Sequence, residues 1–553
     1  MYILDMQKAQ FFWRLFTSIL ILVVYSYVFS VPLTGSGVGV TAIWWLFGVP
    51  AILFVVRRLH KTLITISIWV LNTLFALDLA AQLILVDFFG AMPQPAVVVE
   101  ALVNTNKAET ADFLHSHSVN IIKATLGVLL FWLFAYVETK FVITLPDKRV
   151  KPFDRRWEFA KNTFVVIGFL FVGLLHTNPT MMRGHPLLRF PVYWDRFQTA
   201  QAEIKEITQK RSLYFNELTK YIGEAHDQRA ENAQIIKVII IGESSNRDNW
   251  SLYGYTRDTT EPLDNLVDAT PQNFQVFKSA YSTEPFTIQS LTKSLIFKVD
   301  KGEQHFINGP DVFQVAQRYG FQTAWLSNQP KGEGWFAAIA DTFDHQTFIN
   351  NGNWRDSSST DIELLPHLNQ TLESVHGSQL LVVIHVLGQH FFYEQRCPNE
   401  QLRYKGIIDP VTESLKNQGR STRTINARNA YDSAVYCGAS FLSKVINQLS
   451  HRAAQSEAQI DLMYFSDHGQ EVGHNDDISS HSAIFESGYK IPLFTWHSLP
   501  RESATATLES YFELDQLPST LMSFLNTKTL QLYNPIDDLF SQNFVERPMR
   551  NFR

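Results

Sequence analysis

The chain has very little cysteine, and its charge does not favour a nucleic-acid partner. Only Cys397 and Cys437 occur in 553 residues, which excludes a disulfide framework and a thiolate metal cluster. Spacing alone does not decide whether these two form a bridge. The net charge is −6, and no basic arm or aromatic-basic pattern is present. The sequence also contains no internal repeat and no low-complexity segment.

The N-terminal third consists largely of long uncharged apolar runs. A helix needs roughly 20 apolar residues to span a bilayer. Five runs are long enough or nearly so: Leu15–Val31, Val38–Val56, Leu63–Val86, Ala124–Val142 and Trp157–His176. The fifth is weaker because two charged residues lie in its first turn. We predict a five-helix transmembrane domain over residues 1–177, and no cleaved signal peptide, because more spans follow the first run.

Basic residues in the loops predict the orientation of these spans. They follow the second and fourth runs: Arg57, Arg58, Lys61, Lys148, Arg149, Lys151, Arg155 and Arg156. The loop between the third and fourth runs has only Lys107 among its basic residues. Positive loops stay inside, so the N-terminus is expected in the cytoplasm and everything after the fifth span outside. In a bacterial inner membrane, the C-terminal domain would then be periplasmic.

After the spans, the pattern changes to that of a water-soluble α/β domain. Residues 178–233 form a connector, which contains an amphipathic helical stretch at Asp195–Ile222. From residue 234, short apolar strand-like runs alternate with helical or irregular stretches: Ile235–Ile241, Thr323–Leu326, Leu380–Val386, Asp461–Phe465 and Ile491–Trp496. We therefore predict that residues 234–553 form a mostly parallel sheet covered on both faces.

Metal-ligating side chains follow two of these runs directly. The run Ile235–Ile241 ends in a glycine turn that carries Glu243, and Ile460–Phe465 ends in a turn that carries Asp467 and His468. Ligands in α/β folds sit at the carboxyl ends of the strands, so these turns are expected to converge. Carboxylate and imidazole groups suit a divalent transition metal, most simply zinc.

A hydroxyl group is placed to join this site. Thr287 follows a hydroxyl-rich turn and precedes a predicted helix over Ile288–Phe297. Free backbone N–H groups at a helix start favour an anion, and a metal-bound hydroxyl there can be deprotonated and attack phosphorus. The alternative interpretation is that Thr287 only caps the helix. The local sequence leaves both open.

Several motifs occur in a fixed order along the chain: Gly242-Glu-Ser-Ser-Asn-Arg, Trp250-Ser-Leu-Tyr-Gly-Tyr-Thr-Arg-Asp-Thr-Thr260, Tyr281–Leu291, His385-Val-Leu-Gly-Gln-His390, Asn429-Ala-Tyr-Asp-Ser433 and Ser466-Asp-His-Gly469, followed by His481. Together, in this order and spacing, they resemble the bacterial phosphoethanolamine transferases. The resemblance implies a multi-span α-helical membrane domain and an α/β periplasmic domain of the alkaline-phosphatase or sulfatase-like type.

The resemblance also implies roles for individual residues. Glu243, Thr287, Asp467 and His468 match the zinc site of that family, with Thr287 as the nucleophile. His390 and His481 match histidines that line the substrate region and assist proton transfer, in some members near a second zinc. Thr105 and Glu109 match residues near the lipid headgroup, and Asn328 falls where the family places polar substrate contacts.

The implied reaction takes phosphoethanolamine from phosphatidylethanolamine and passes it, through a phosphoethanolamine-threonine intermediate, to lipopolysaccharide or another periplasmic glycan. Lipid A-modifying members flank the nucleophile with cysteines, whereas Ser282-Thr-Glu-Pro-Phe-Thr287 has none, so a core sugar is the favoured acceptor. Three alternatives stay open: a membrane-tethered phosphodiesterase or sulfatase-type hydrolase, a phosphoglycerol transferase, and a non-catalytic scaffold. The formylglycine motif of a usual sulfatase does not occur near Thr287.

Overall fold

The computed structural model describes two long helices, scattered residues between 159 and 198, and most of residues 234–552. The gaps in the last part are 298–309, 332–334, 351–358, 375–377, 398–401, 457, 502–507 and 529–531. The two helices belong to one compact unit and the residues from 234 onward to another. The predicted connector helix at Asp195–Ile222 lies almost entirely outside the described residues, and the predicted domain limits stay predictions.

The two helices coincide with the third and fourth predicted spans. Helix α4 covers Lys61–Phe89 and α7 covers Ser118–Thr144, and they pack against each other. Within the described residues, α7 is the one helix long and apolar enough to cross a membrane, with a mean hydropathy of 1.8 over Ser118–Val137. Its leucine and isoleucine side chains are exposed at many positions, as expected where lipid is the solvent. The first two predicted spans lie outside the described residues, as does most of the fifth.

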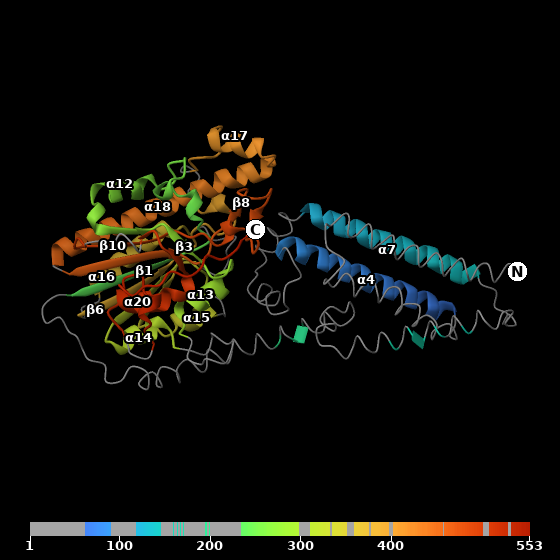
Figure 1. Cartoon of the computed structure of the whole chain (residues 1–553), viewed down its shortest axis with the longest axis horizontal. Helices are drawn as coiled ribbons and strands as arrows, with labels where there is room; N and C mark the ends of the chain where they lie inside the picture. Colours follow the sequence, from blue (N-terminus) through green and yellow to red (C-terminus); the bar gives the residue numbers. More distant parts are fainter. Residues whose placement is uncertain are drawn as a thin grey trace. The chain divides into compact units, whose positions relative to one another are not determined.

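The second unit is built on a seven-stranded sheet in the order β2-β10-β7-β1-β6-β4-β5 (Figure 1). Its strands are β1 Ile235–Gly242, β2 Phe274–Phe277, β4 Gln322–Ser327, β5 His345–Phe348, β6 Gln379–His385, β7 Gln459–Ser466 and β10 Leu493–His497. Neighbours from β7 to β5 pair in parallel, whereas β10 runs antiparallel to β7 and β2. All five predicted strands are present, and the prediction of a mostly parallel sheet is confirmed.

Helices cover both faces of this sheet, as predicted. One face packs against α12 Glu261–Ala269, α16 Leu364–Ser374 and α18 Thr422–Ser456, and the other against α13 Thr287–Leu295, α14 Val312–Arg318, α15 Trp335–Ala340 and α20 Leu517–Phe524. Strand β1 supplies alternate side chains to the two cores, in keeping with the two-residue period of a strand. Ile236, Val238 and Ile240 join the core under α18, and Ile239 and Ile241 join the core under α13.

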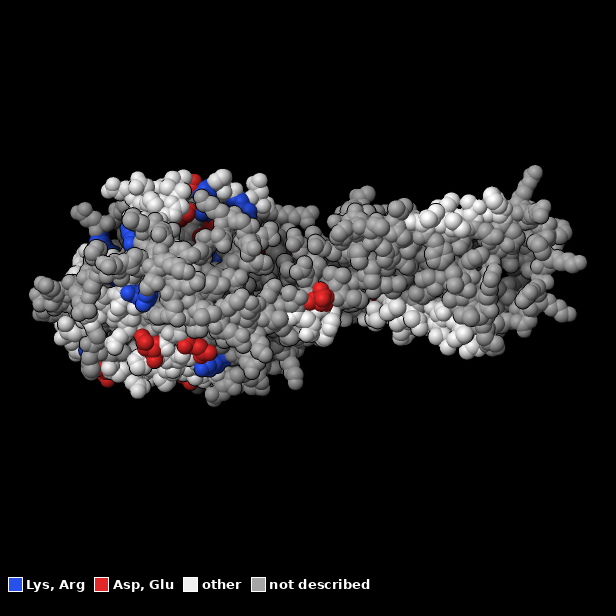
Figure 2. All heavy atoms as spheres, turned by 90° about the horizontal axis from the view of Figure 1, so that it is seen from below, with Lys and Arg blue, Asp and Glu red and all other residues white. Residues whose placement is uncertain are grey.

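The remaining strands form two separate two-stranded sheets, β3 Ser279–Tyr281 with β11 Tyr511–Glu513 and β8 Glu471–Val472 with β9 Ser479–Ser480. A further short α-helix is α17 Pro410–Asn417, and several 3-10 turns complete the described part. Among the described residues visible in Figure 2, side chains of both charges occur close to one another.

One charged side chain of β1 is buried and needs a partner. The Nζ atom of Lys237 lies 2.6 Å from Oδ2 of Asp461 on β7. The other carboxylate oxygen, Oδ1, lies 2.8 Å from Nδ1 of His497, and Arg501 also reaches Asp461 at 3.1 Å. This paired network explains how a lysine fits in the middle of a central strand.

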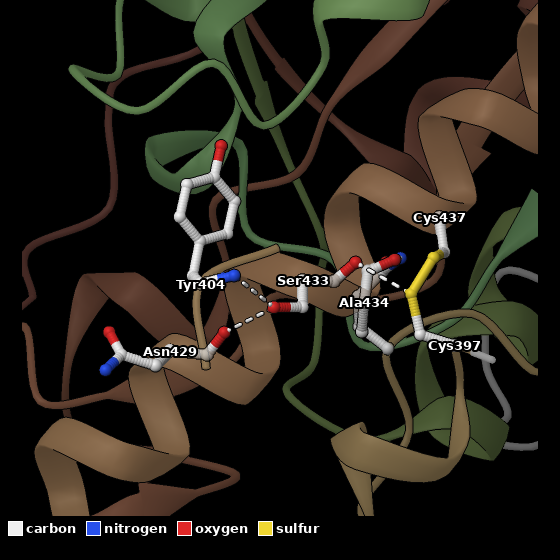
Figure 3. The surroundings of a disulfide bond; sticks show 7 residues. Cys397, Tyr404, Asn429, Ser433, Ala434 and Cys437 are labelled. Carbon is white, nitrogen blue, oxygen red and sulfur yellow. Dashed lines mark hydrogen bonds between the residues drawn. A yellow bond between two sulfur atoms is a disulfide. The ribbon is translucent and has the colours of Figure 1, made fainter. Parts of the chain in front are cut away.

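The two cysteines form a disulfide, which the spacing had left open. The bond joins Cys397, which follows the 3-10 turn Tyr393–Gln395, to Cys437 of α18 (Figure 3). Nearby, the Ser433 hydroxyl accepts a hydrogen bond from the backbone N–H of Tyr404 at 3.1 Å. The bridge therefore fastens the segment after β6 to the long helix.

Candidate metal centre

The turn after β1 places Glu243 at the carboxyl end of the sheet. Glu243 is fully buried, and its carboxylate oxygen Oε1 accepts a hydrogen bond from the Ser244 hydroxyl at 2.8 Å. Its backbone carbonyl accepts the N–H of Gln389 at 3.0 Å. Gly388 has a φ of +50° and packs so closely on Glu243 that an added Cβ would lie 2.8 Å from the Glu243 carbonyl oxygen. This contact fixes the backbone that carries the carboxylate.

The turn after β7 brings Asp467 and His468 to the same place. Oδ1 of Asp467 accepts the backbone N–H groups of Ser244 at 2.9 Å and of His468 at 2.7 Å. Oδ2 is buried and has no hydrogen-bond partner among the described residues. Nδ1 of His468 lies 2.7 Å from the Gly469 carbonyl oxygen, so it carries the proton and donates. In the neutral imidazole Nε2 then keeps its lone pair, which is the form that a metal ligand requires. Nε2 lies 3.5 Å from Oε1 of Glu243 and 3.4 Å from Oδ2 of Asp467.

Thr287 faces these ligands and does not cap its helix. Helix α13 begins at Thr287, and the N-cap position belongs to Phe286. The Thr287 Oγ1 atom lies 3.3 Å from both carboxylate oxygens of Glu243 and 3.3 Å from Nε2 of His468. The alternative interpretation of Thr287 as an N-cap is therefore wrong, and the predicted helix starts one residue earlier than expected.

Burial and crowding strongly perturb the charges of the three groups. Burial raises the pKa of Asp467 to about 7, and the negative charge of Glu243 adds to the effect. Burial works to lower the pKa of His468, but the carboxylates of Asp467 and Glu243 outweigh it and raise the pKa to about 9. Burial works to raise the pKa of Glu243, but the hydrogen bond and charge of His468 hold it well below its ordinary value.

These groups fit a divalent metal. The ligand atoms of Glu243, Asp467 and His468 all lie within 4.8 Å of one another. Oδ2 of Asp467 accepts no hydrogen bond from the described residues and lies 3.4 Å from Nε2 of His468. One cation bound here would offset the buried negative charge of the two carboxylates and would favour the neutral form of His468, whose Nε2 can then coordinate it. Two carboxylates and one imidazole leave a coordination position open, which is typical of a catalytic zinc site.

The two predicted histidines lie beside this cluster. The ring of His481 meets the ring of His468 edge-on at 4.7 Å between centroids, and it also contacts Phe286 and Phe391. Burial lowers the pKa of His481 well below its usual value, and positive charge on His468 adds to this. His390 is buried, and its charge helps to lower the pKa of Glu243.

Of the three predicted substrate-binding residues, only Asn328 lies within the described residues. Asn328 is buried, and its side chain donates to Asp361 at 2.8 Å and accepts from Ser359 at 2.7 Å, so its amide is engaged inside the protein. A role for Asn328 in substrate binding stays a prediction. Thr105 and Glu109 lie outside the described residues.

Sequence reasoning missed a neighbour of the candidate metal ligands Glu243, Asp467 and His468. The side-chain amide of Gln329 donates to Oε2 of Glu243 at 3.3 Å and to the Val386 carbonyl oxygen at 2.9 Å. Its position directly after Asn328, at the end of β4, was the available signal, because side chains at that edge of a parallel sheet face the site.

The second part of the chain matches a family of known proteins. Residues 237–527 match the family described as Sulfatase, which is more than half of the chain. The chain belongs to the sulfatase family. Among its curated relatives, phosphoethanolamine transferase EptC of Escherichia coli strain K12 is 27% identical over 303 residues, which cover 51% of this chain and 50% of that protein. The chain thus spans about half the length of the curated relatives it matches.

Two solved structures extend the comparison for this sulfatase-family chain. One is the zinc complex of the C-terminal periplasmic domain of EptC from Escherichia coli. Its alignment covers 58% of this chain and 90% of the EptC domain, at 25% identity and a TM-score of 0.51. The integral membrane protein EptA, lipooligosaccharide phosphoethanolamine transferase A of Neisseria meningitidis, covers 97% of this chain and 98% of its own, at 18% identity and a TM-score of 0.59. The predicted fold class and the resemblance to phosphoethanolamine transferases are confirmed.

Proposed function

We propose that this protein transfers phosphoethanolamine from phosphatidylethanolamine to lipopolysaccharide, with a core sugar favoured, or to another periplasmic glycan. The observation that carries the proposal is the position of Thr287. Its hydroxyl oxygen lies 3.3 Å from the carboxylate oxygens of Glu243 and from Nε2 of His468. A hydroxyl held against metal-ligating groups at a helix start is suited to attack phosphorus.

The metal would be held by Glu243, Asp467 and His468, with the Thr287 hydroxyl as a further ligand. When bound, zinc supplies Lewis acidity that lowers the pKa of a coordinated hydroxyl and offsets charge on phosphoryl oxygens. One such site is proposed, and the neighbouring His390 and His481 would be the side chains available to a second ion.

The first step forms a bond between Thr287 Oγ1 and the phosphorus of the donor lipid. The bond from phosphorus to the glycerol oxygen breaks, and diacylglycerol leaves with the proton that the Thr287 hydroxyl has lost. In the second step an acceptor hydroxyl oxygen attacks the same phosphorus, the bond from phosphorus to Thr287 Oγ1 breaks, and the proton lost by the acceptor hydroxyl returns to Thr287. His390 and His481 are the proposed groups that carry these protons, since both lie beside the cluster.

A lipid donor explains why a phosphoethanolamine transferase would carry membrane-spanning helices. Phosphatidylethanolamine stays in the bilayer, so an enzyme that uses it benefits from an anchor in the same membrane. We place the protein in the bacterial inner membrane as a multi-pass protein, with the catalytic domain in the periplasm. The disulfide between Cys397 and Cys437 supports this side of the membrane, because disulfides persist in oxidising compartments.

The test is the intact mass of the full-length protein after incubation with phosphatidylethanolamine and zinc. We expect a phosphoethanolamine-sized adduct that maps to Thr287 and is absent in Thr287→Ala. The matched control is Thr292→Ala, which removes a hydroxyl from the same helix and should keep the adduct. The acceptor is then identified by adding lipopolysaccharide with or without core sugars and following loss of the adduct.

Other outcomes separate the alternatives. Loss of lipid with release of free ethanolamine phosphate, and no adduct, would contradict the transferase and favour a hydrolase. An adduct formed from phosphatidylglycerol but not from phosphatidylethanolamine would make the protein a phosphoglycerol transferase. Normal transfer by Thr287→Ala would refute the covalent route.

A further inference from the structure

Ser244 is held in a backbone conformation that serine rarely adopts. Its φ is +55°, in the left-handed region, where a side chain with a Cβ is strained. Both of its hydrogen-bond donors point at the metal cluster: the backbone N–H bonds Oδ1 of Asp467 at 2.9 Å, and the hydroxyl bonds Oε1 of Glu243 at 2.8 Å. Ser244 therefore orients the carboxylates of Glu243 and Asp467, which directly follow strands β1 and β7.

A buried tyrosine on α18 holds this strained turn in place. The Tyr431 hydroxyl donates to the carbonyl oxygen of Ser244 at 2.7 Å and accepts the backbone N–H of Asn246 at 2.8 Å. The ring is fully buried and meets the ring of Tyr393 edge-on at 5.1 Å. The Tyr431 hydroxyl thus fastens the backbone of the turn on both sides of Ser245.

We infer that Tyr431 is a positioning residue for the metal site, acting through Ser244 on Glu243 and Asp467; this rests on the proposed function. Without the hydroxyl, the Ser244 carbonyl and the Asn246 N–H lose this partner, and the strained φ loses the contact that opposes its relaxation. Rotation of Ser244 would then move its N–H and hydroxyl away from both carboxylates. Residues behind the direct ligands commonly set metal affinity in this way.

The chain contains a matched control for this hydroxyl. The Tyr253 hydroxyl makes a similar pair of backbone bonds, donating to the carbonyl oxygen of Leu493 and accepting its N–H, both at 2.9 Å. These two bonds fasten β10 rather than the turn that carries Glu243. Tyr431→Phe and Tyr253→Phe therefore each remove a hydroxyl that makes two backbone hydrogen bonds. Only the Tyr431 hydroxyl bonds the turn that carries Glu243.

The experiment measures zinc affinity of the full-length protein by competition with a chromophoric zinc chelator, together with thermal unfolding of the zinc-free protein. We expect Tyr431→Phe to bind zinc about 10-fold to 100-fold more weakly than the unchanged protein. Tyr253→Phe should bind zinc normally although it loses stability too. Equal affinity in all three proteins, or equal weakening in both variants, would overturn the inference.

A second variant covers the case in which Tyr431→Phe does not fold. Ser244→Gly adopts a positive φ without strain and keeps the N–H for Asp467, but it lacks the hydroxyl that bonds Glu243. We expect it to fold and to bind zinc more weakly. Unchanged affinity would show that Ser244 does not act on Glu243 through its hydroxyl, and would overturn the inference that Tyr431 positions both carboxylates through Ser244. If the unchanged protein binds no zinc, the proposed metal site itself fails, which is a distinct result.

Discussion

Replacing Gly388 by alanine tests how tightly the backbone of Glu243, a proposed metal ligand, is packed. Gly388 has a φ of +50°, and an alanine Cβ there would lie 2.8 Å from the carbonyl oxygen and 3.0 Å from the nitrogen of Glu243. Because both of these are backbone atoms, neither can move aside as a flexible side chain would. The substitution should therefore displace Glu243 as well as strain its own residue.

The loss of folding free energy expected for Gly388→Ala has two parts. A left-handed backbone costs an alanine about 1–2 kcal/mol of folding free energy. The steric overlap adds roughly 1–3 kcal/mol, the usual cost of overpacking. Gly406→Ala isolates the first part, because Gly406 has a φ of +69° and none of the described atoms lies within 4 Å of an added Cβ.

The assay is urea unfolding of both variants, with zinc affinity measured alongside. We expect Gly388→Ala to be less stable than Gly406→Ala by about the overlap cost of 1–3 kcal/mol. Zinc binding should weaken by about 10-fold in Gly388→Ala alone, since only that change moves a ligand. If the two variants agree in stability and zinc affinity, the packing argument at Glu243 is refuted.

Three further predictions concern stability. Asp461→Asn should cost about 3–5 kcal/mol in urea unfolding, because it leaves the buried Lys237 ammonium unpaired, and a loss below about 1 kcal/mol would contradict this. Burial works to raise the pKa of Asp461, but the hydrogen bond of His497 and the charge of Lys237 outweigh it and hold the pKa well below its usual value. The resulting stability is present above about pH 4, the unfolded pKa, and is lost as pH falls further, which acid titration of unfolding checks against Asp461→Asn. Replacing both Cys397 and Cys437, which lie 40 residues apart, by serine should cost about 4 kcal/mol in the chain-entropy view, and an unchanged unfolding midpoint would contradict it.

Much of the metal site could be predicted from the sequence because its ligands follow continuous apolar strands. Glu243, Asp467 and His468 come directly after two such runs, and parallel strands end at one edge of the sheet. The same local pattern predicted the five strands and the spans that coincide with α4 and α7. Strands β2 and β5 were missed, because each has four residues and lies at an edge of the sheet, where the apolar pattern is weak.

The sequence by itself determined the alternation of strands and helices, the ligand types and the apolar spans, because these are set by neighbours along the chain. Only the tertiary structure decided what depends on distant residues. It decided that Thr287 faces Glu243 instead of capping α13, and that the two cysteines meet. It also joined Ser244 to Tyr431, 187 residues further along, since a hydrogen bond between such residues exists only when packing brings their atoms together.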